Sequence, residues 1–175
     1  MSFVAWLVSA GYVAGFLALT AALARRSGQK LWLFDAGQAG AAWGFRIAFA
    51  ILVLWPVVTR AGGAPIWIVP AAVSAAFALY AQACMGRSWR IGTKEGAIGE
   101  IVTGCPFRLS RNPVFVGQIA FSWFLTPLVG LPMAVAAAIM TASAVMQVRS
   151  EEVVLGQNAD WRRYSEKTPR WIGWM

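Results

Sequence analysis

Histidine is absent from this sequence, which removes the side chain that proteins use most often as a general base and as a metal ligand. There are only two cysteines, Cys84 and Cys105, and their spacing fits no metal site and requires no disulfide. Charged residues are also scarce, at 13% of the chain, whereas soluble domains usually carry about 25%. We therefore expect no metal centre and no ordinary soluble domain.

Apolar residues fill most of the sequence. They make up 59% of the 175 residues, and the chain contains ten tryptophans. The apolar residues also occur in long blocks, which a soluble core does not need. At this length one domain is the default. The composition predicts a single all-α domain, residues 1–175, built as a polytopic bundle of membrane helices.

The first half of the chain, residues 1–85, contains three apolar runs that are long enough to be membrane spans. The first extends from Phe3 to Ala24, and the others extend from about Ala41 to Val58 and from Pro65 to Met85. No basic residue precedes the first run, whereas a signal peptide carries basic residues ahead of its apolar core. We interpret this run as a retained span.

The second half, residues 86–175, begins with the longest polar segment, from Gly86 to Asn112. Two apolar arms follow, and they are separated at residues 130–132. Each arm, with the second expected to end at Val148, is shorter than the roughly 20 residues that a crossing helix needs. The arms form either a tilted hairpin that spans the membrane or a hairpin that enters it only part way. The count is therefore about five transmembrane helices, followed by a polar C-terminal tail.

The charges fall on one side of this topology. All lysines and arginines except Arg46 and Arg60 lie in residues 25–30, 87–111 and 149–170, and the seven acidic residues lie on the same side. The positive-inside rule places this side in the cytoplasm and the N-terminus outside, as in a protein of the bacterial inner membrane. The net charge of +8 suits anionic lipid headgroups, because its basic residues lie in short loops between spans. We expect no nucleic-acid partner.

Two acidic residues, Glu151 and Glu152, follow the second arm at the predicted membrane boundary. Carboxylates in this position can bind a cofactor amine, accept hydrogen bonds from ribose hydroxyls or take up a proton. The alternative is a solvated helix end in which Arg149 pairs with Glu152 at a spacing of three residues.

A second polar group precedes the first arm, at Arg111-Asn112-Pro113. Proline suits the first position of a helix, so we expect Pro113 to begin one. The free amides at that helix start favour an anion, Asn112 can cap the helix or bind a ligand, and Arg111 can hold a carboxylate. The alternative is a plain capped helix with an arginine that extends to the membrane surface.

These elements occur together in a recognisable order. The segment GEIVTGCPFRLSRNPVFVG, residues 99–117, is followed after the hairpin by Glu151-Glu152-Val-Val-Leu155, by Trp161 and Tyr164, and by Pro169-Arg170. The series, together with Gly86-Arg-Ser-Trp89-Arg90 upstream, resembles the isoprenylcysteine carboxyl methyltransferase and phospholipid methyltransferase-like family of integral membrane enzymes. The resemblance covers residues 86–173.

The resemblance implies S-adenosylmethionine as methyl donor, bound in a cytoplasmic pocket that the C-terminal tail completes. It implies that the catalytic residues are Arg111, Glu152 and Arg170. It also implies a set of cofactor-binding residues drawn from the loop, the helix start, the acidic pair and the tail: Gly99, Ile101, Val102, Asn112, Pro113, Phe115, Glu151, Glu152 and Tyr164. The methyl acceptor would enter sideways from the bilayer.

The chain departs from the family pattern at four positions, and these departures leave the class of substrate open. Gly99 and Asn112 replace histidines, and Phe107 and Phe115 replace tyrosines. The lipophilic acceptor therefore stays open between a carboxylate, an amine and a thiol, and the oligomeric state is also open. Two other interpretations compete with methyl transfer: an NADPH-dependent membrane ene or sterol-type reductase, and a non-catalytic membrane scaffold.

Overall fold

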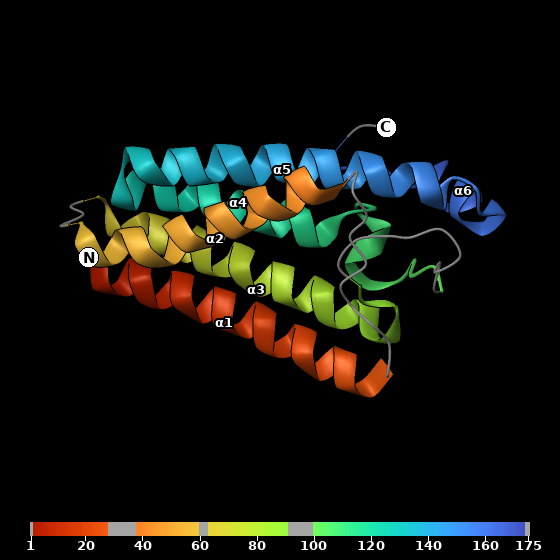
Figure 1. Ribbon diagram of the computed structural model, residues 1–175, viewed down its shortest axis with the longest axis horizontal. Helices are drawn as coiled ribbons and strands as arrows, with labels where there is room; N and C mark the ends of the chain where they lie inside the picture. Colours follow the sequence, from red (N-terminus) through yellow and green to blue (C-terminus); the bar gives the residue numbers. More distant parts are fainter. Residues whose placement is uncertain (1, 28–37, 60–62, 91–99, 174–175) are drawn as a thin grey trace.

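The computed structural model describes residues 2–27, 38–59, 63–90 and 100–173 and is all-α (Figure 1). Its six α-helices are α1 (Ser2–Ser27), α2 (Ala39–Val58), α3 (Ile68–Met85), α4 (Pro113–Val129), α5 (Leu131–Leu155) and α6 (Ala159–Ser165). Three short 3₁₀ turns, η2 (Pro65–Trp67), η3 (Gly86–Ser88) and η4 (Cys105–Arg108), flank α3 and precede α4. The predicted fold class is confirmed at this level.

The five long helices run along one axis and alternate in direction (Figure 1). Helix α4 packs against both α3 and α5, α2 packs along α5, and α1 contacts α2 and α3. One end of the bundle therefore gathers the last residues of α1, α3 and α5 with the first residues of α2 and α4. The short helix α6 extends from this same end. This end holds both polar groups that the sequence analysis identified.

Among the described residues, four helical segments are long and apolar enough to cross a membrane: Phe3–Ser27, Ala39–Val58, Pro65–Ser88 and Leu131–Leu155. They indicate an integral membrane protein, and they agree with the three predicted N-terminal spans. Helix α4 is also apolar but has only 17 residues, so at about 1.5 Å per residue it is some 26 Å long. Of the two predicted arms of the hairpin, α4 is the one whose helix is as short as expected.

The prediction that the second arm ends near Val148 is wrong, because α5 continues to Leu155 and has 25 residues. Its polar last turns remain helical because their side chains find partners. Gln147 donates to Glu151 one turn further on, and Glu152 pairs with arginines outside the helix. The alternative interpretation, an ion pair between Arg149 and Glu152, does not occur in the part of the chain that the structure describes.

Small residues allow the helices to approach closely at the centre of the bundle. A Cβ atom added to Gly117 of α4 would lie 2.8 Å from the backbone nitrogen of Ala78 in α3. Further along α4, Phe121 and Leu125 are completely buried, as are Met133 and Met140 of α5. The close α3–α4 contact and the α4–α5 hairpin together fix where the start of α4 lies relative to the end of α5.

Candidate functional site

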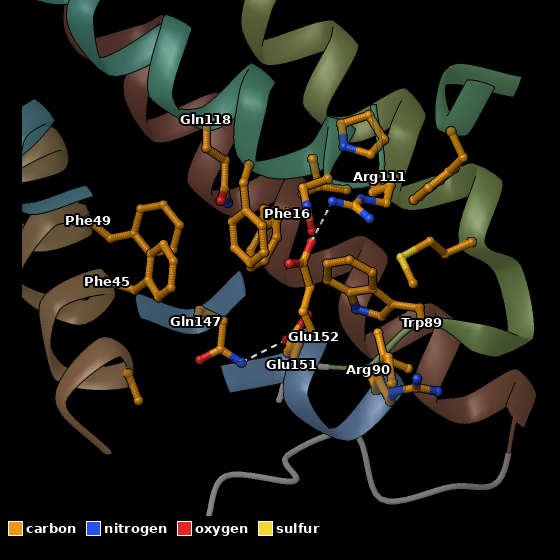
Figure 2. Close-up of a pocket in the computed structure, with 18 of the residues that line it drawn as sticks. Phe16, Phe45, Phe49, Trp89, Arg90, Arg111, Gln118, Gln147, Glu151 and Glu152 are labelled. Carbon is orange, nitrogen blue, oxygen red and sulfur yellow. Dashed lines mark hydrogen bonds and ion pairs between the residues drawn. The ribbon is translucent and has the colours of Figure 1, made fainter. Parts of the chain in front are cut away.

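A cavity of about 400 Å³ lies at the polar end of the bundle, where α4 begins and α5 ends (Figure 2). Side chains from α1, α2, α4 and α5 line it, together with Trp89 and Arg90 after α3 and Trp161 of α6. One region of its wall is charged, and the rest is mainly aromatic and apolar. The two regions are described in turn.

Glu152 is the centre of the charged region. Its Oε2 accepts hydrogen bonds from Arg170, with Nε at 2.8 Å, and its Oε1 lies 3.3 Å from Nη2 of Arg111. The Glu152 side chain is 13% exposed and that of Arg111 is 14% exposed. The Arg111 contact is an ion pair without hydrogen-bond geometry, so Oε1 of Glu152 and Nε of Arg111 have no hydrogen-bond partner among the described residues.

Arg111 also holds the C-terminal tail in place. Its guanidinium lies over the ring of Trp161, 5.3 Å from the centroid, and donates to the backbone oxygen of Ser165 at 3.3 Å. Its backbone nitrogen donates to the backbone oxygen of Pro169 at 2.9 Å. An arginine side chain that extended to the membrane surface would make neither of the two guanidinium contacts, so that alternative does not describe Arg111.

Asn112 precedes Pro113, the first residue of α4, as expected. It does not cap the helix with its side chain; instead its Nδ2 donates to the backbone oxygen of Arg170 at 3.1 Å. The hydroxyl of Ser110 donates to the same oxygen at 3.0 Å. The start of α4 and the tail are therefore joined by side-chain and backbone bonds.

Glu151 lies beside Glu152 in a different environment. Its Oε1 accepts from Nε2 of Gln147 at 2.7 Å, and it makes no ion pair within 4 Å among the described residues. Arg90 is on the same side of the cavity (Figure 2). Partial burial lowers the pKa of Arg90, and the negative charge of Glu151 opposes this shift. Glu151 is thus a carboxylate that a ligand can still reach.

Two tail residues act outside the cavity wall. The hydroxyl of Tyr164 donates to the backbone oxygen of Phe107 at 2.6 Å, and burial raises the pKa of Tyr164 to about 12. The hydrogen bond to Glu152 raises the pKa of Arg170. Both residues remain in their hydrogen-bonding protonation states at neutral pH, and both fasten the tail to the bundle.

The apolar region of the cavity is mainly aromatic. Phe45 of α2 stacks on Phe115 of α4 with centroids 5.6 Å apart, and Phe16 of α1 meets Trp89 edge to face at 5.7 Å. The wall also includes Leu17 of α1, which is 49% exposed. The wall of the cavity therefore includes at least one apolar side chain that is also accessible from outside the bundle.

The structure brings together many of the residues that the sequence analysis named. Arg111, Glu152 and Arg170 form one ion-paired cluster, although Arg170 does not line the cavity. Six of the named residues line it: Arg111, Asn112, Pro113, Phe115, Glu151 and Glu152. Ile101, Val102 and Tyr164 do not line it. Gly99 lies outside the described residues.

Sequence reasoning missed several cavity residues. The most informative are Gln118 and Gln147, which line the wall and are each 2% exposed. Each is a carboxamide within an otherwise apolar run, and an isolated polar residue in a membrane span is a signal of function. The aromatic residues Phe16, Phe45 and Phe49 gave no such signal, because aromatic residues are common throughout these spans.

Comparison of the chain with models of protein families, with curated proteins and with solved structures finds no match in any of the three. What the site does must therefore be argued from the chemistry of its own residues.

Proposed function

We propose that this protein is an integral membrane methyltransferase that transfers the methyl group of S-adenosylmethionine to a lipophilic acceptor. The observation that carries the proposal is the cavity, in which a charged region and an aromatic region adjoin. A methyl donor with a sulfonium, an amino acid and a ribose is polar and charged, whereas an acceptor drawn from the bilayer is apolar. A cavity with two such regions suits one ligand of each kind.

The charged region fits the donor because two of its buried polar atoms have unused hydrogen-bonding capacity, although one of them takes part in an ion pair. Oε1 of Glu152 and Nε of Arg111 are buried without hydrogen bonds among the described residues, and buried polar groups are normally paired. Glu151 and Glu152 would hold the ammonium and the ribose hydroxyls, and Arg90 would hold the carboxylate.

S-adenosylmethionine supplies a methyl group already activated by the sulfonium, so the protein does not need a histidine to activate it. The work of the side chains is to orient the acceptor in line with the methyl group and to exclude water. An amine or alcohol acceptor must also lose a proton, and Glu151 and Glu152 are the carboxylates in the cavity wall that can take it.

The acceptor would reach the aromatic region from the bilayer. It would enter beside the exposed side chain of Leu17 on α1, where Arg46 of α2 in the same wall is a cation suited to a lipid headgroup. We place the charged region in the cytoplasm, with the N-terminus outside, because the arginines gather at this end. Five crossings follow if α4 spans with local thinning of the bilayer.

The direct test is calorimetric titration of the protein in lipid nanodiscs with S-adenosylhomocysteine and, separately, with NADPH. We expect binding of S-adenosylhomocysteine and none of NADPH. Incubation with labelled S-adenosylmethionine and a total lipid extract should then yield a labelled lipophilic product. Binding of NADPH alone would contradict the methyltransferase and support the reductase. Binding of neither ligand would support the non-catalytic scaffold.

A further inference from the structure

Two glutamines in the apolar part of the cavity present polar groups without partners. Gln118 lies five residues after the start of α4, which places it about 7.5 Å deeper in the bundle than Pro113. Its side chain is 2% exposed and points into the cavity (Figure 2). Its Oε1 has no hydrogen-bond partner among the described residues. The Tyr12 hydroxyl interacts with the Gln118 side chain, but this contact lacks hydrogen-bond geometry, and the hydroxyl too has no hydrogen-bond partner among the described residues.

Gln147 contributes the second group from α5, the helix that packs against α4. It is also 2% exposed and also lines the cavity. Its Nε2 donates to the Glu151 carboxylate at 2.7 Å, which accepts only, so the orientation of the amide is fixed. Its Oε1 is therefore an acceptor, and it has no partner in the described part of the chain.

An acceptor without a partner is costly in this location. A buried carbonyl oxygen loses its hydrogen bond to water, and the hydrocarbon beside the bundle provides no replacement. Two such oxygens lie on neighbouring helices at one cavity, and a ligand that brings a hydrogen-bond donor satisfies one of them with each proton it donates. An ionised carboxylate brings only acceptors and would meet these oxygens and the Glu151 carboxylate.

We infer that Gln118 and Gln147 form a subsite for a hydroxyl or amine group on a lipophilic ligand. The identification of this ligand as the methyl acceptor rests on the proposed function, and it selects a protic acceptor over a carboxylate. Both glutamines are then positioning and specificity-determining residues: they hold the O–H or N–H group so that its lone pair faces the methyl donor.

Methyl transfer to such an acceptor balances with the groups in the cavity. A new O–C or N–C bond forms as the S–C bond of the sulfonium breaks, and the sulfur keeps the electron pair as a neutral thioether. The proton of the acceptor passes to a carboxylate, for which Glu151 is suited because it lines the same cavity and has no ion-pair partner in the described part of the chain. No oxidant, reductant or further reactant is needed.

The test uses three probes of equal chain length: dodecan-1-ol, dodecyl methyl ether and dodecanoate. Each is added at the same mole fraction to full-length protein in nanodiscs without methyl donor, and thermal unfolding is followed by tryptophan fluorescence. The wild type should bind the alcohol about fivefold more tightly than the ether, the contribution of roughly one hydrogen bond. Of Gln118→Met and Gln147→Met, at least the variant that removes the oxygen that accepts the hydroxyl proton should lose this preference while still binding both probes.

Gln82 provides a matched control. It is fully buried, its Oε1 also lacks a partner among the described residues, and its Nε2 donates to the Phe16 backbone oxygen and the Thr20 hydroxyl. It does not line the cavity. Gln82→Met should therefore lower the melting temperature but keep the wild-type preference for the alcohol.

Three outcomes would overturn the subsite: equal binding of alcohol and ether by the wild type, a stronger response to dodecanoate, or an alcohol preference retained in both glutamine variants. If Gln118→Met gives no unfolding transition, the subsite is still tested by Gln147→Met and by the comparison of alcohol and ether binding to the wild type. A protein that shows the alcohol preference but binds no S-adenosylhomocysteine supports the subsite and refutes the methyltransferase. Binding of S-adenosylhomocysteine without the preference refutes the subsite alone.

Discussion

Arg170 donates a hydrogen bond from Nε to Oε2 of Glu152, at 2.8 Å, and so joins the C-terminal tail to the last turns of α5. The backbone oxygen of Arg170 accepts from Ser110 and Asn112 at the start of α4. One tail residue thus bridges the two polar groups that are far apart in the sequence. The cavity depends on this bridge because Glu152 lines it and Arg170 helps to hold Glu152.

Replacing Arg170 with alanine should loosen the tail and weaken donor binding. The Arg170 side chain is 43% exposed, so solvent screens part of its interaction with Glu152. We expect the dissociation constant for S-adenosylhomocysteine to rise about fivefold, in line with the loss of roughly one charged hydrogen bond. Calorimetry measures the affinity, and limited proteolysis reports release of the tail.

Arg163→Ala is the control for this change, because Arg163 pairs with Asp160 on the exposed surface of α6. Exposed pairs of this kind contribute little to stability. Equal effects of the two substitutions on affinity would show that the Arg170 contact has no special role at the cavity.

Glu152→Gln should have the larger effect. The amide removes the negative charge that pairs with Arg111 and Arg170, and it leaves the poorly exposed Arg111 without its counter-ion. We expect donor affinity to fall by about tenfold or more and most turnover to be lost. Glu166→Gln, at an exposed position that does not line the cavity, should match the wild type. Wild-type affinity of Glu152→Gln for S-adenosylhomocysteine would contradict the assignment of Glu152.

The contact of Tyr164 with Phe107 should make docking of the tail sensitive to high pH. Burial raises the pKa of Tyr164 to about 12 when the tail is docked, whereas an exposed tyrosine has a pKa of about 10. The docked form therefore binds the proton more tightly, and docking loses free energy as the pH rises from about 10 to about 12. Below this range the full contribution is present.

Limited proteolysis at a series of alkaline pH values tests this prediction. The wild-type tail should become cleavable across that range, on top of any general unfolding. Tyr164→Phe should be cleaved more readily at neutral pH, because it lacks the hydrogen bond to Phe107, and should show less additional cleavage at high pH. A variant that follows the wild-type curve at every pH would show that Tyr164 does not control docking.

The sequence was sufficient for the membrane helices because their signal is local. An apolar run such as Phe3–Ala24 needs no knowledge of distant residues to be identified as a span, and Pro113 marks a helix start through its own geometry. The end of α5 was misplaced because its last turns are polar. Arg111 and Arg170 help to keep these turns helical by pairing with Glu152, and no local sequence pattern around Glu152 reveals those partners.

The site was only partly predictable for the same reason. Charged residues near the membrane boundary drew attention to Arg111 and Glu152, but spacing along the chain could not place Tyr164 against Phe107 rather than in the cavity. Gln118 and Gln147 carried a usable signal as polar residues within apolar spans. Their convergence on one cavity depends on how α4 packs against α5, which the sequence alone does not specify.

The α3–α4 contact predicts the effect of one methyl group. A Cβ at Gly117 would lie 2.7 Å from the Cβ of Ala78 and 2.8 Å from its backbone nitrogen. Since both atoms belong to a packed helix, Gly117→Ala should push α4 away from α3 and destabilise the protein by about 1–3 kcal/mol. Gly11→Ala is the matched control, because Gly11 is also helical but a Cβ there has no atom within 4 Å. Thermal unfolding in nanodiscs should show a lower melting temperature for Gly117→Ala only.

The same variant should also bind S-adenosylhomocysteine less tightly, because α4 and the residue before it bring Gln118 and Asn112 to the cavity. If both stability and affinity were unchanged, the α3–α4 contact would be looser than the structure has it.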